Sequence, residues 1–265
     1  MMFGNAEAYD RFMGRWSRVL APLLVDFAGV PDAGRVLEIG SGIGTLAFEI
    51  AKRETGRQVT GIDPSNEFVA YAISQNAFPD RTSFHVGDAQ DLHFADATFV
   101  AALSLLVFNF IPDPEKALRE TCRVTKRGGR ITAAVWDYGD EMRMLRAFWD
   151  AAAEVDPRAE KVDEKHMPLC RASELSQLWK QAGLEEVHEQ PLDITMSFDS
   201  FSDYWEPFLL GQGPAGAYVR SVDTDRLAML RNTVKRRLSL SSENDAFALH
   251  ARVWAVRGTV PGGGA

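Results

Sequence analysis

The sequence contains only two cysteines in 265 residues, and they stand far apart at Cys122 and Cys170. Neither belongs to a CxxC pair or a cysteine–histidine spacing, which argues against a disulfide framework and a structural zinc site. The chain also lacks a run of about eighteen apolar residues and the apolar core of a signal peptide near its start. We therefore expect a cytoplasmic protein with no bound metal and no membrane partner.

Positive charge is scarce as well. The chain has 29 Lys and Arg against 37 Asp and Glu, a net charge of −8 at pH 7. Affinity for nucleic acid comes largely from basic side chains on phosphates, so this balance predicts no nucleic-acid partner. The composition, 46% apolar and 25% charged, is typical of a globular protein that buries a core. We expect a small-molecule substrate and a monomer or homodimer.

Short apolar runs rich in β-branched residues alternate with helical patterns in the first half of the chain. The runs predict buried strands at 35–40, 58–63, 82–88, 99–108 and 129–136. Helical patterns lie between them, the clearest running from the capping residue Asp113 to Gly128. Such alternation indicates an α/β fold, a Rossmann-like, doubly wound, mostly parallel sheet wrapped by helices.

The regular alternation of strand and helix patterns ends after Trp136. Residues 138–168 are helical and polar in pattern, a further helix ends at Gly183, and strand-like runs follow at 184–198 and 246–260. We expect these late runs to form an antiparallel pair at one edge of a seven-stranded sheet. The aromatic-rich stretch between them is too long for a hairpin connection, which predicts a helical insertion.

The segment VLEIGSGIGTLAFEIA, residues 36–51, places three glycines between a predicted strand and a predicted helix. Such a turn brings backbone N–H groups and a helix N-terminus to the negative groups of a ligand. The spacing Gly40-x-Gly42-x-Gly44 departs from the dinucleotide fingerprint, because Thr45 stands where a third small residue is expected. The sequence contains no GxxxxGK[ST] phosphate loop.

Three acids stand at the carboxyl ends of predicted strands, the edge where parallel sheets bind ligands. Glu38 lies within the first apolar run, where an ionised carboxylate is costly unless it meets a cation or hydrogen-bond donors. Asp63 ends the second strand, where its carboxylate suits the two hydroxyls of a ribose. Asp88 ends the third, where an acid also commonly caps the next helix.

The chain resembles the class I S-adenosylmethionine-dependent methyltransferases, specifically a group of bacterial small-molecule enzymes, in the segments VLEIGSGIG, VTGIDPS, VGDAQDLHF, LSLLVFNFIPDPEKALRETCRVTKRGG and ITAAVWD. The resemblance covers residues 7–137 strongly and the helix and strand after them more loosely. It implies S-adenosyl-L-methionine as cofactor and transfer of its methyl group to an O, N or C atom of a small molecule. Such an in-line displacement needs proximity and alignment rather than a metal.

The resemblance also implies which residues contact the cofactor's methionine and ribose. Gly40, Ser41 and Gly42 face the methionine part. Glu38 meets its ammonium group, and Asp63, followed by Pro64 in the same motif, takes the ribose.

Further residues are implied at the adenine and at the sulfonium. Asp88 accepts from the adenine amino group, and the backbone of Ala89 meets the ring nitrogen beside it. Ser104 and Leu105, at the end of the fourth predicted strand, lie along the methionine and the sulfonium.

The sequence fixes no catalytic set. His166, Asp137 and Tyr138 are candidates for contact with the acceptor or for a base, which is required only for a weakly acidic hydroxyl or a carbon acid. Tyr9 and Trp16 cover the cofactor as a lid in one interpretation and anchor the N-terminal segment in the core in the other. Two alternatives for the whole protein are a non-catalytic S-adenosylmethionine-binding protein and an NAD-dependent oxidoreductase, the latter disfavoured by the glycine spacing.

These patterns predict a division of the chain by role. The parts are an N-terminal helical lid at 1–30, a cofactor-binding core at 31–137, a helical segment over the site at 138–168, the completion of the sheet at 169–198 and 239–260, and a helical insertion forming a substrate roof at 199–238.

Overall fold

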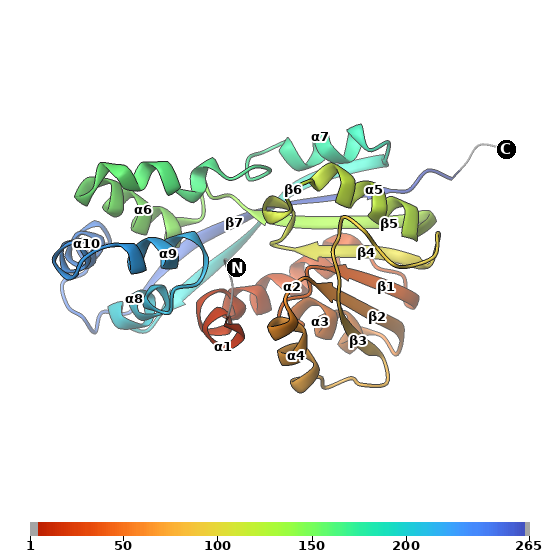
Figure 1. Ribbon diagram of the computed structural model, residues 1–265, viewed down its shortest axis with the longest axis horizontal. Helices are drawn as coiled ribbons and strands as arrows, with labels where there is room; N and C mark the ends of the chain where they lie inside the picture. Colours follow the sequence, from red (N-terminus) through yellow and green to blue (C-terminus); the bar gives the residue numbers. More distant parts are fainter. Residues whose placement is uncertain (1–4, 263–265) are drawn as a thin grey trace. The chain divides into compact units, whose positions relative to one another are not determined.

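A mixed sheet organises the fold (Figure 1). Within residues 5–262, which the computed structural model describes, it has seven strands in the order β3-β2-β1-β4-β5-β7-β6. Their bounds are β1 Ala33–Ile39, β2 Gly56–Asp63, β3 Thr82–Val86, β4 Phe99–Leu105, β5 Thr125–Trp136, β6 Glu185–Phe198 and β7 Phe247–Thr259. Strands β1 to β5 pair in parallel.

The late edge of the sheet is antiparallel. Val260 N–H donates to Gly129 O at 2.9 Å, and Asp137 N–H donates to Arg252 O at 2.9 Å. Residue numbers therefore rise along β5 as they fall along β7. The predicted seven-stranded, mostly parallel sheet with an antiparallel edge pair is confirmed.

Helices connect the strands, and three of them fill the predicted insertion. The bounds are α1 Ala6–Tyr9, α2 Arg15–Ala28, α3 Thr45–Arg53, α4 Asn66–Ser74, α5 Pro114–Val124, α6 Arg143–Val155, α7 Glu174–Gln181, α8 Phe201–Leu209, α9 Gly213–Ser221 and α10 Thr224–Arg237. Shorter turns are the π-helical η1 Asp10–Gly14 and the 3-10 helices η2 Phe108–Phe110, η3 Pro157–Val162 and η4 Glu164–His166.

Helix α5 begins where the sequence predicts and ends earlier. Asp113 caps its start by accepting from Lys116 N–H at 2.9 Å. At its end, the Thr125 hydroxyl donates to Thr121 O at 2.7 Å. Thr125 pairs with Phe99, so the residues from there to Gly128 belong to β5. The predicted helix end at Gly128 is wrong because pairing between distant strands overrides the local pattern.

The chain forms two compact units, each made of separate segments. Unit 1 comprises the described part of 1–15 with 136–167 and 193–252, and unit 2 comprises 16–135 and 168–192 with the described part of 253–265. The predicted N-terminal lid is thus divided after Arg15, and its first four residues lie outside the described residues.

Unit 2 buries its core on β1, β4 and β5 against α5 and α7. Leu37, Ala102 and Ile131 come from the strands and Trp179 from α7, all at most 1% exposed. The indole N–H of Trp179 donates to Ile131 O at 3.1 Å, which satisfies its polar atom inside the core. Each large aliphatic side chain in this layer, such as Leu37 or Ile131, contributes about 1.5–3 kcal/mol by burial, so the layer stabilises the strands that carry the glycine turn.

Unit 1 is held by the aromatic residues of the insertion. Phe148 of α6 and Phe208 of α8 stack with ring centroids 4.6 Å apart. Tyr204 is 1% exposed, and its hydroxyl donates to Met144 O at 2.8 Å. The aromatic stretch therefore serves first as the core of unit 1.

Candidate functional site

The glycine turn joins β1 to α3 in a conformation that favours glycine. Gly40, Gly42 and Gly44 have φ of +69°, +49° and +87°. A Cβ on Gly40 would lie 2.4 Å from a methyl of Val107, so that position also has no room for a side chain. A Cβ on Gly42 would meet nothing within 4 Å. The turn is therefore packed on one side and open at Gly42, where a ligand can approach the backbone.

Glu38 is buried beside this turn, at 2% exposure. Burial raises the pKa of its carboxyl well above the ordinary value, the hydrogen bond from the Ala47 backbone lowers it, and the nearby Asp63 raises it. Within the described structure, Glu38 Oε2 has no hydrogen-bond partner. A buried carboxylate oxygen without a donor suits a cationic ligand group such as an ammonium.

Asp63 ends β2 and fastens two turns. Its Oδ2 accepts from Gly42 N–H at 2.9 Å, and its Oδ1 accepts from Ser65 N–H at 2.9 Å. Burial raises the pKa of Asp63, and these two backbone bonds lower it. Each oxygen keeps a second acceptor position for a ligand hydroxyl. Sequence reasoning missed the tie to the glycine turn, and neighbouring Pro64 is exposed.

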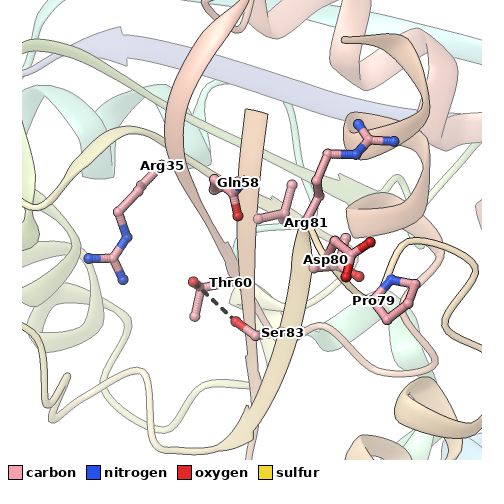
Figure 2. A pocket seen from close by; sticks show the side chains of 9 residues that line it. Arg35, Gln58, Thr60, Pro79, Asp80, Arg81 and Ser83 are labelled. Carbon is pink, nitrogen blue, oxygen red and sulfur yellow. Dashed lines mark hydrogen bonds between the residues drawn. The ribbon is translucent and has the colours of Figure 1, made fainter. Parts of the chain in front are cut away.

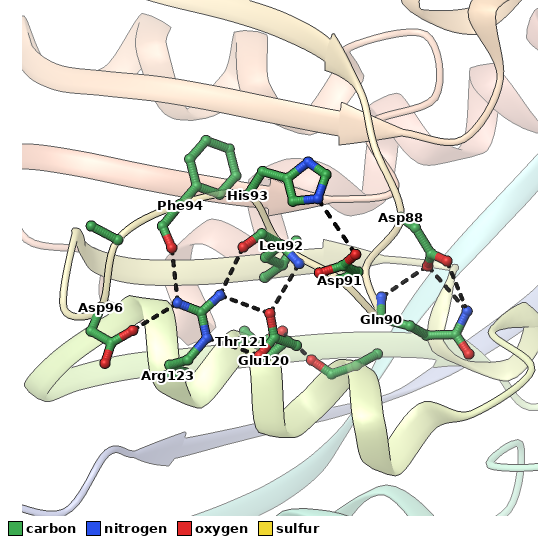
Figure 3. A network of polar contacts seen from close by, with 12 residues as sticks. Asp88, Gln90, Asp91, Leu92, His93, Phe94, Asp96, Glu120, Thr121 and Arg123 are labelled. Carbon is green, nitrogen blue, oxygen red and sulfur yellow. Dashed lines mark hydrogen bonds and ion pairs between the residues drawn. The ribbon is translucent and has the colours of Figure 1, made fainter.

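Asp88 lies in the turn after β3 (Figure 3). Strand β3 ends at Val86, so Asp88 stands two residues beyond it rather than at its end. The exposed carboxylate accepts from Gln90 N–H at 2.8 Å and from the Gln90 side chain at 3.1 and 3.2 Å. Ala89 is partly buried and packs against the core of unit 2.

The end of β4 carries the remaining predicted pair, and both residues are buried. Ser104 is 1% exposed, and its hydroxyl donates to Ile39 O at 3.0 Å, which joins β4 to β1. Leu105 is 8% exposed. The hydroxyl of Ser104 therefore has a structural partner already, and its contact with a cofactor stays a prediction.

Among the other buried polar side chains that have atoms without a hydrogen-bond partner in the described residues, two follow strands β1 and β4. They are the hydroxyl of Ser41, inside the glycine turn, and both amide atoms of Asn109, which is 4% exposed and lies in η2 after β4. Sequence reasoning missed Asn109, although an amide between two phenylalanines in an apolar run was the available signal. Ser41 and Glu38, which both belong to the segment 36–51, leave a hydroxyl and a carboxyl oxygen available to a ligand.

The structure divides the other predicted residues between the units. Trp16 is 6% exposed in α2 of unit 2. Tyr9, half-buried in α1, belongs to unit 1 together with the acceptor candidates Asp137, Tyr138 and His166.

The three acceptor candidates differ in burial. Asp137 is 5% and Tyr138 is 4% exposed. Burial raises the pKa of Asp137, while the bond from Asp140 N–H to its carboxylate lowers it. His166 is exposed, with Nε2 3.5 Å from Glu160 Oε1. Asp137 therefore combines a buried position with a carboxyl pKa raised from its ordinary value.

A separate hollow of about 290 Å³ lies in unit 2 on β1, β2 and β3 (Figure 2). Arg35, Gln58, Thr60 and Ser83 are among its lining residues, and the Ser83 hydroxyl lies 3.5 Å from that of Thr60. It contains none of the predicted site residues. We interpret it as a solvated polar part of the sheet.

Residues 5–262 offer neither a metal site nor a membrane-spanning helix. That part of the chain has no group of three or more His, Cys, Asp or Glu arranged to hold a metal ion. It also has no helix long and apolar enough to cross a membrane.

Comparison with known proteins finds similarity to methyltransferases. Residues 37–133 match the family model described as a methyltransferase domain. The 2-methyl-6-phytyl-1,4-hydroquinone methyltransferase of Synechocystis is 34% identical over 122 residues, which are 46% of this chain and 38% of that protein. The first curated relatives are matched over 28%, 38% and 53% of their own lengths.

Two solved structures are similar over nearly all of this chain. The YcgJ protein of Bacillus subtilis has a TM-score of 0.61 at 18% identity, covering 92% of this chain and 98% of its own. The phosphoethanolamine N-methyltransferase 2 of Haemonchus contortus, in complex with phosphomonomethylethanolamine and S-adenosylhomocysteine, has a TM-score of 0.59 at 18% identity, covering 97% of this chain and 57% of its own. At these identities the likeness is one of fold.

Proposed function

We propose that the chain is a class I S-adenosylmethionine-dependent methyltransferase, which transfers the methyl group of S-adenosyl-L-methionine to an O, N or C atom of a small molecule; the match of residues 37–133 to a methyltransferase domain supports this. The observation that carries this proposal is the glycine turn. It is open at Gly42 and lies beside a buried carboxylate, Glu38, whose Oε2 lacks a donor within the described structure. An ammonium-bearing nucleoside satisfies both features.

The residues of unit 2 would bind and orient this cofactor. Glu38 would accept from its ammonium group, and Asp63 would use its free acceptor positions for the ribose hydroxyls. The backbone of the turn at Gly42 would pack against the methionine part. The bound sulfonium supplies an already activated methyl group, so the chain's own task is to align the acceptor and exclude water.

We assign selection of the acceptor to the segments 138–168 and 199–238, the predicted helical segment and substrate roof. The small, partly apolar acceptor stays a prediction from the aromatic-rich sequence of 199–238, because the aromatic side chains described there pack in the core of unit 1. Asp137 is the residue we propose as base where the acceptor needs one, because burial raises its pKa. Tyr138 and His166 stay predictions, as does the lid role of Tyr9 and Trp16.

Calorimetry and methyl-transfer assays test the proposal together. We expect S-adenosylmethionine and S-adenosylhomocysteine to bind and to raise the melting temperature, since a ligand of the native state stabilises it by mass action, and NAD to do neither. Labelled methyl groups should appear on at least one member of a panel of quinols, phenols and amines, with and without EDTA. Stabilisation by NAD alone would overturn the cofactor assignment. Cofactor binding without transfer to any panel member would favour the non-catalytic alternative.

A further inference from the structure

In the turn after β3, the side chain of Gln90 makes hydrogen bonds beyond the one that closes the turn. Asp88 Oδ1 accepts from the backbone N–H of Gln90 at 2.8 Å, and an acid closes a turn of this kind with that bond alone. Yet Gln90 Nε2 also donates to both carboxylate oxygens of Asp88, at 3.1 and 3.2 Å. Figure 3 shows the Gln90 side chain beside the carboxylate. The extra bonds constrain the orientation of that carboxylate.

The other end of the Gln90 side chain is held by helix α5. Gln90 Oε1 accepts from the backbone N–H of Asp113 at 3.1 Å, and Asp113 is the residue that caps α5. Both ends of the amide are therefore bonded, which fixes its plane. The carboxylate of Asp88 is thus oriented relative to the first turn of α5.

The loop behind Gln90 is fastened to the same helix (Figure 3). Arg123 of α5 donates to Leu92 O at 2.7 Å and to Phe94 O at 2.8 Å. Glu120, which Arg123 also contacts at 2.7 Å, accepts from Leu92 N–H at 3.0 Å. Charge-assisted bonds therefore hold the backbone at Leu92, two residues after Gln90. The Gln90 side chain thus connects an anchored loop to the start of helix α5.

Asp88 keeps capacity for one more partner. A carboxylate offers about four acceptor positions, and Gln90 occupies two on Oδ1 and one on Oδ2. The remaining position on Oδ2 belongs to an exposed side chain. A donor approaching it meets a carboxylate whose rotation is restricted.

We propose that Gln90 is a positioning residue that orients Asp88 toward the exocyclic amino group of the cofactor's adenine and so sets discrimination between 6-amino and 6-oxo purines. This inference rests on the proposed function. A 6-oxo purine presents an acceptor to the same oxygen, so a fixed carboxylate rejects it, whereas a freely rotating one turns away and tolerates it.

The test measures by calorimetry the affinities for S-adenosylhomocysteine and for its 6-oxo analogue, S-inosylhomocysteine. We expect the wild type to prefer the amino form by about tenfold or more. Gln90→Met keeps the side-chain length and removes all three side-chain bonds, so the ratio should fall toward that of Asp88→Asn. Gln75→Ala is the matched control, because the exposed Gln75 bonds only locally, to Ser74 and the α4 backbone.

The affinity ratio separates positioning from folding, because a purely structural loss weakens both ligands equally. Gln90→Ala repeats the test should the methionine variant melt earlier than the control. An unchanged ratio in both Gln90 variants, with a collapsed ratio in Asp88→Asn, overturns the inference and leaves the proposed function intact. A preserved ratio in Asp88→Asn also overturns it. Failure of the wild type to bind S-adenosylhomocysteine overturns the proposed function itself.

Discussion

Replacing Glu38 by glutamine should make the ligand-free protein more stable and the complex weaker. The amide keeps an oxygen for the Ala47 backbone N–H and removes the ionisable group whose Oε2 has no partner among the described residues. A carboxyl whose pKa is raised on folding binds its proton more tightly in the native state. The stability of the wild type is therefore fullest below about pH 4.5 and falls as pH rises through the raised pKa.

The magnitudes follow from the cost of holding an ionised carboxyl oxygen without a partner in the interior, since the glutamine amide also leaves one atom unpartnered and removes only the charge. That cost is about 1–3 kcal/mol. In a chain of this size it corresponds to a melting temperature roughly 2 to 10 °C higher for Glu38→Gln than for the wild type at pH 8, with the difference vanishing near pH 4.5. The ammonium bond lost in the complex is worth about 1.5–3 kcal/mol, or roughly 10- to 150-fold in the dissociation constant for S-adenosylhomocysteine.

Thermal melting between pH 5 and 8 and calorimetry at pH 7.5 measure the two effects. Glu54→Gln serves as the matched control, because this acid is exposed. The reasoning fails if Glu38→Gln binds the ligand as tightly as the wild type does. It also fails if the variant is less stable than the wild type at pH 8, since the carboxylate would then have an ionic partner in the free protein.

Three other outcomes are expected. Asp63→Ala should weaken binding of S-adenosylhomocysteine about a hundredfold by calorimetry, because it loses the ribose bonds and releases the glycine turn; unchanged affinity would remove it from the site. Trp149 emission should titrate near pH 7, since burial raises the pKa of its hydrogen-bond partner Glu164 to about 7. The stability that the neutral Glu164 carboxyl contributes to the folded protein is lost as pH rises through that value. A titration that persists in Glu164→Gln would refute this. Arg123→Ala should destabilise the protein at pH 7 and much less at pH 2, because Arg123 lowers the pKa of Glu120 to about 2 and this stability is lost as pH falls from 4.5; equal urea midpoint shifts at both pH values would contradict it.

The sheet was predictable because its signals are local. Buried parallel strands are continuous apolar runs, and each run predicted in the sequence lies within one strand or overlaps its ends. The end of α5 was not predictable, since the pairing of Thr125 with Phe99 depends on a distant strand. Local charge and glycine patterns therefore favoured a longer helix than the fold allows.

The site was predictable in its members and not in their bonds. The sequence places Asp63 at the end of a strand, and nothing in it reveals that this carboxylate also ties down Gly42 and Ser65. Tyr204 illustrates the same gap, because its aromatic neighbours suggest both a pocket and a core, and the bond to Met144 O identifies it as core. Partners such as Tyr204 and Met144 are separated by many residues, so no periodic pattern in the sequence reveals their contact.

The anchoring of Arg15 to Asp203 has a consequence for how the protein is made. Arg15 donates to Asp203 at 2.7 Å across 188 residues, its guanidinium lies 4.9 Å from the ring centroid of Phe198, and Phe12 packs edge-on against Phe208 at 5.1 Å. During synthesis the first residues of unit 1 leave the ribosome long before their partners exist. Unit 1, whose segments are separated by stretches of unit 2, therefore completes its core only after translation has passed residue 252. Until then Phe12 and Arg15 lack the partners they have in the folded protein, so the N-terminal segment of unit 1 cannot dock before those later residues are made.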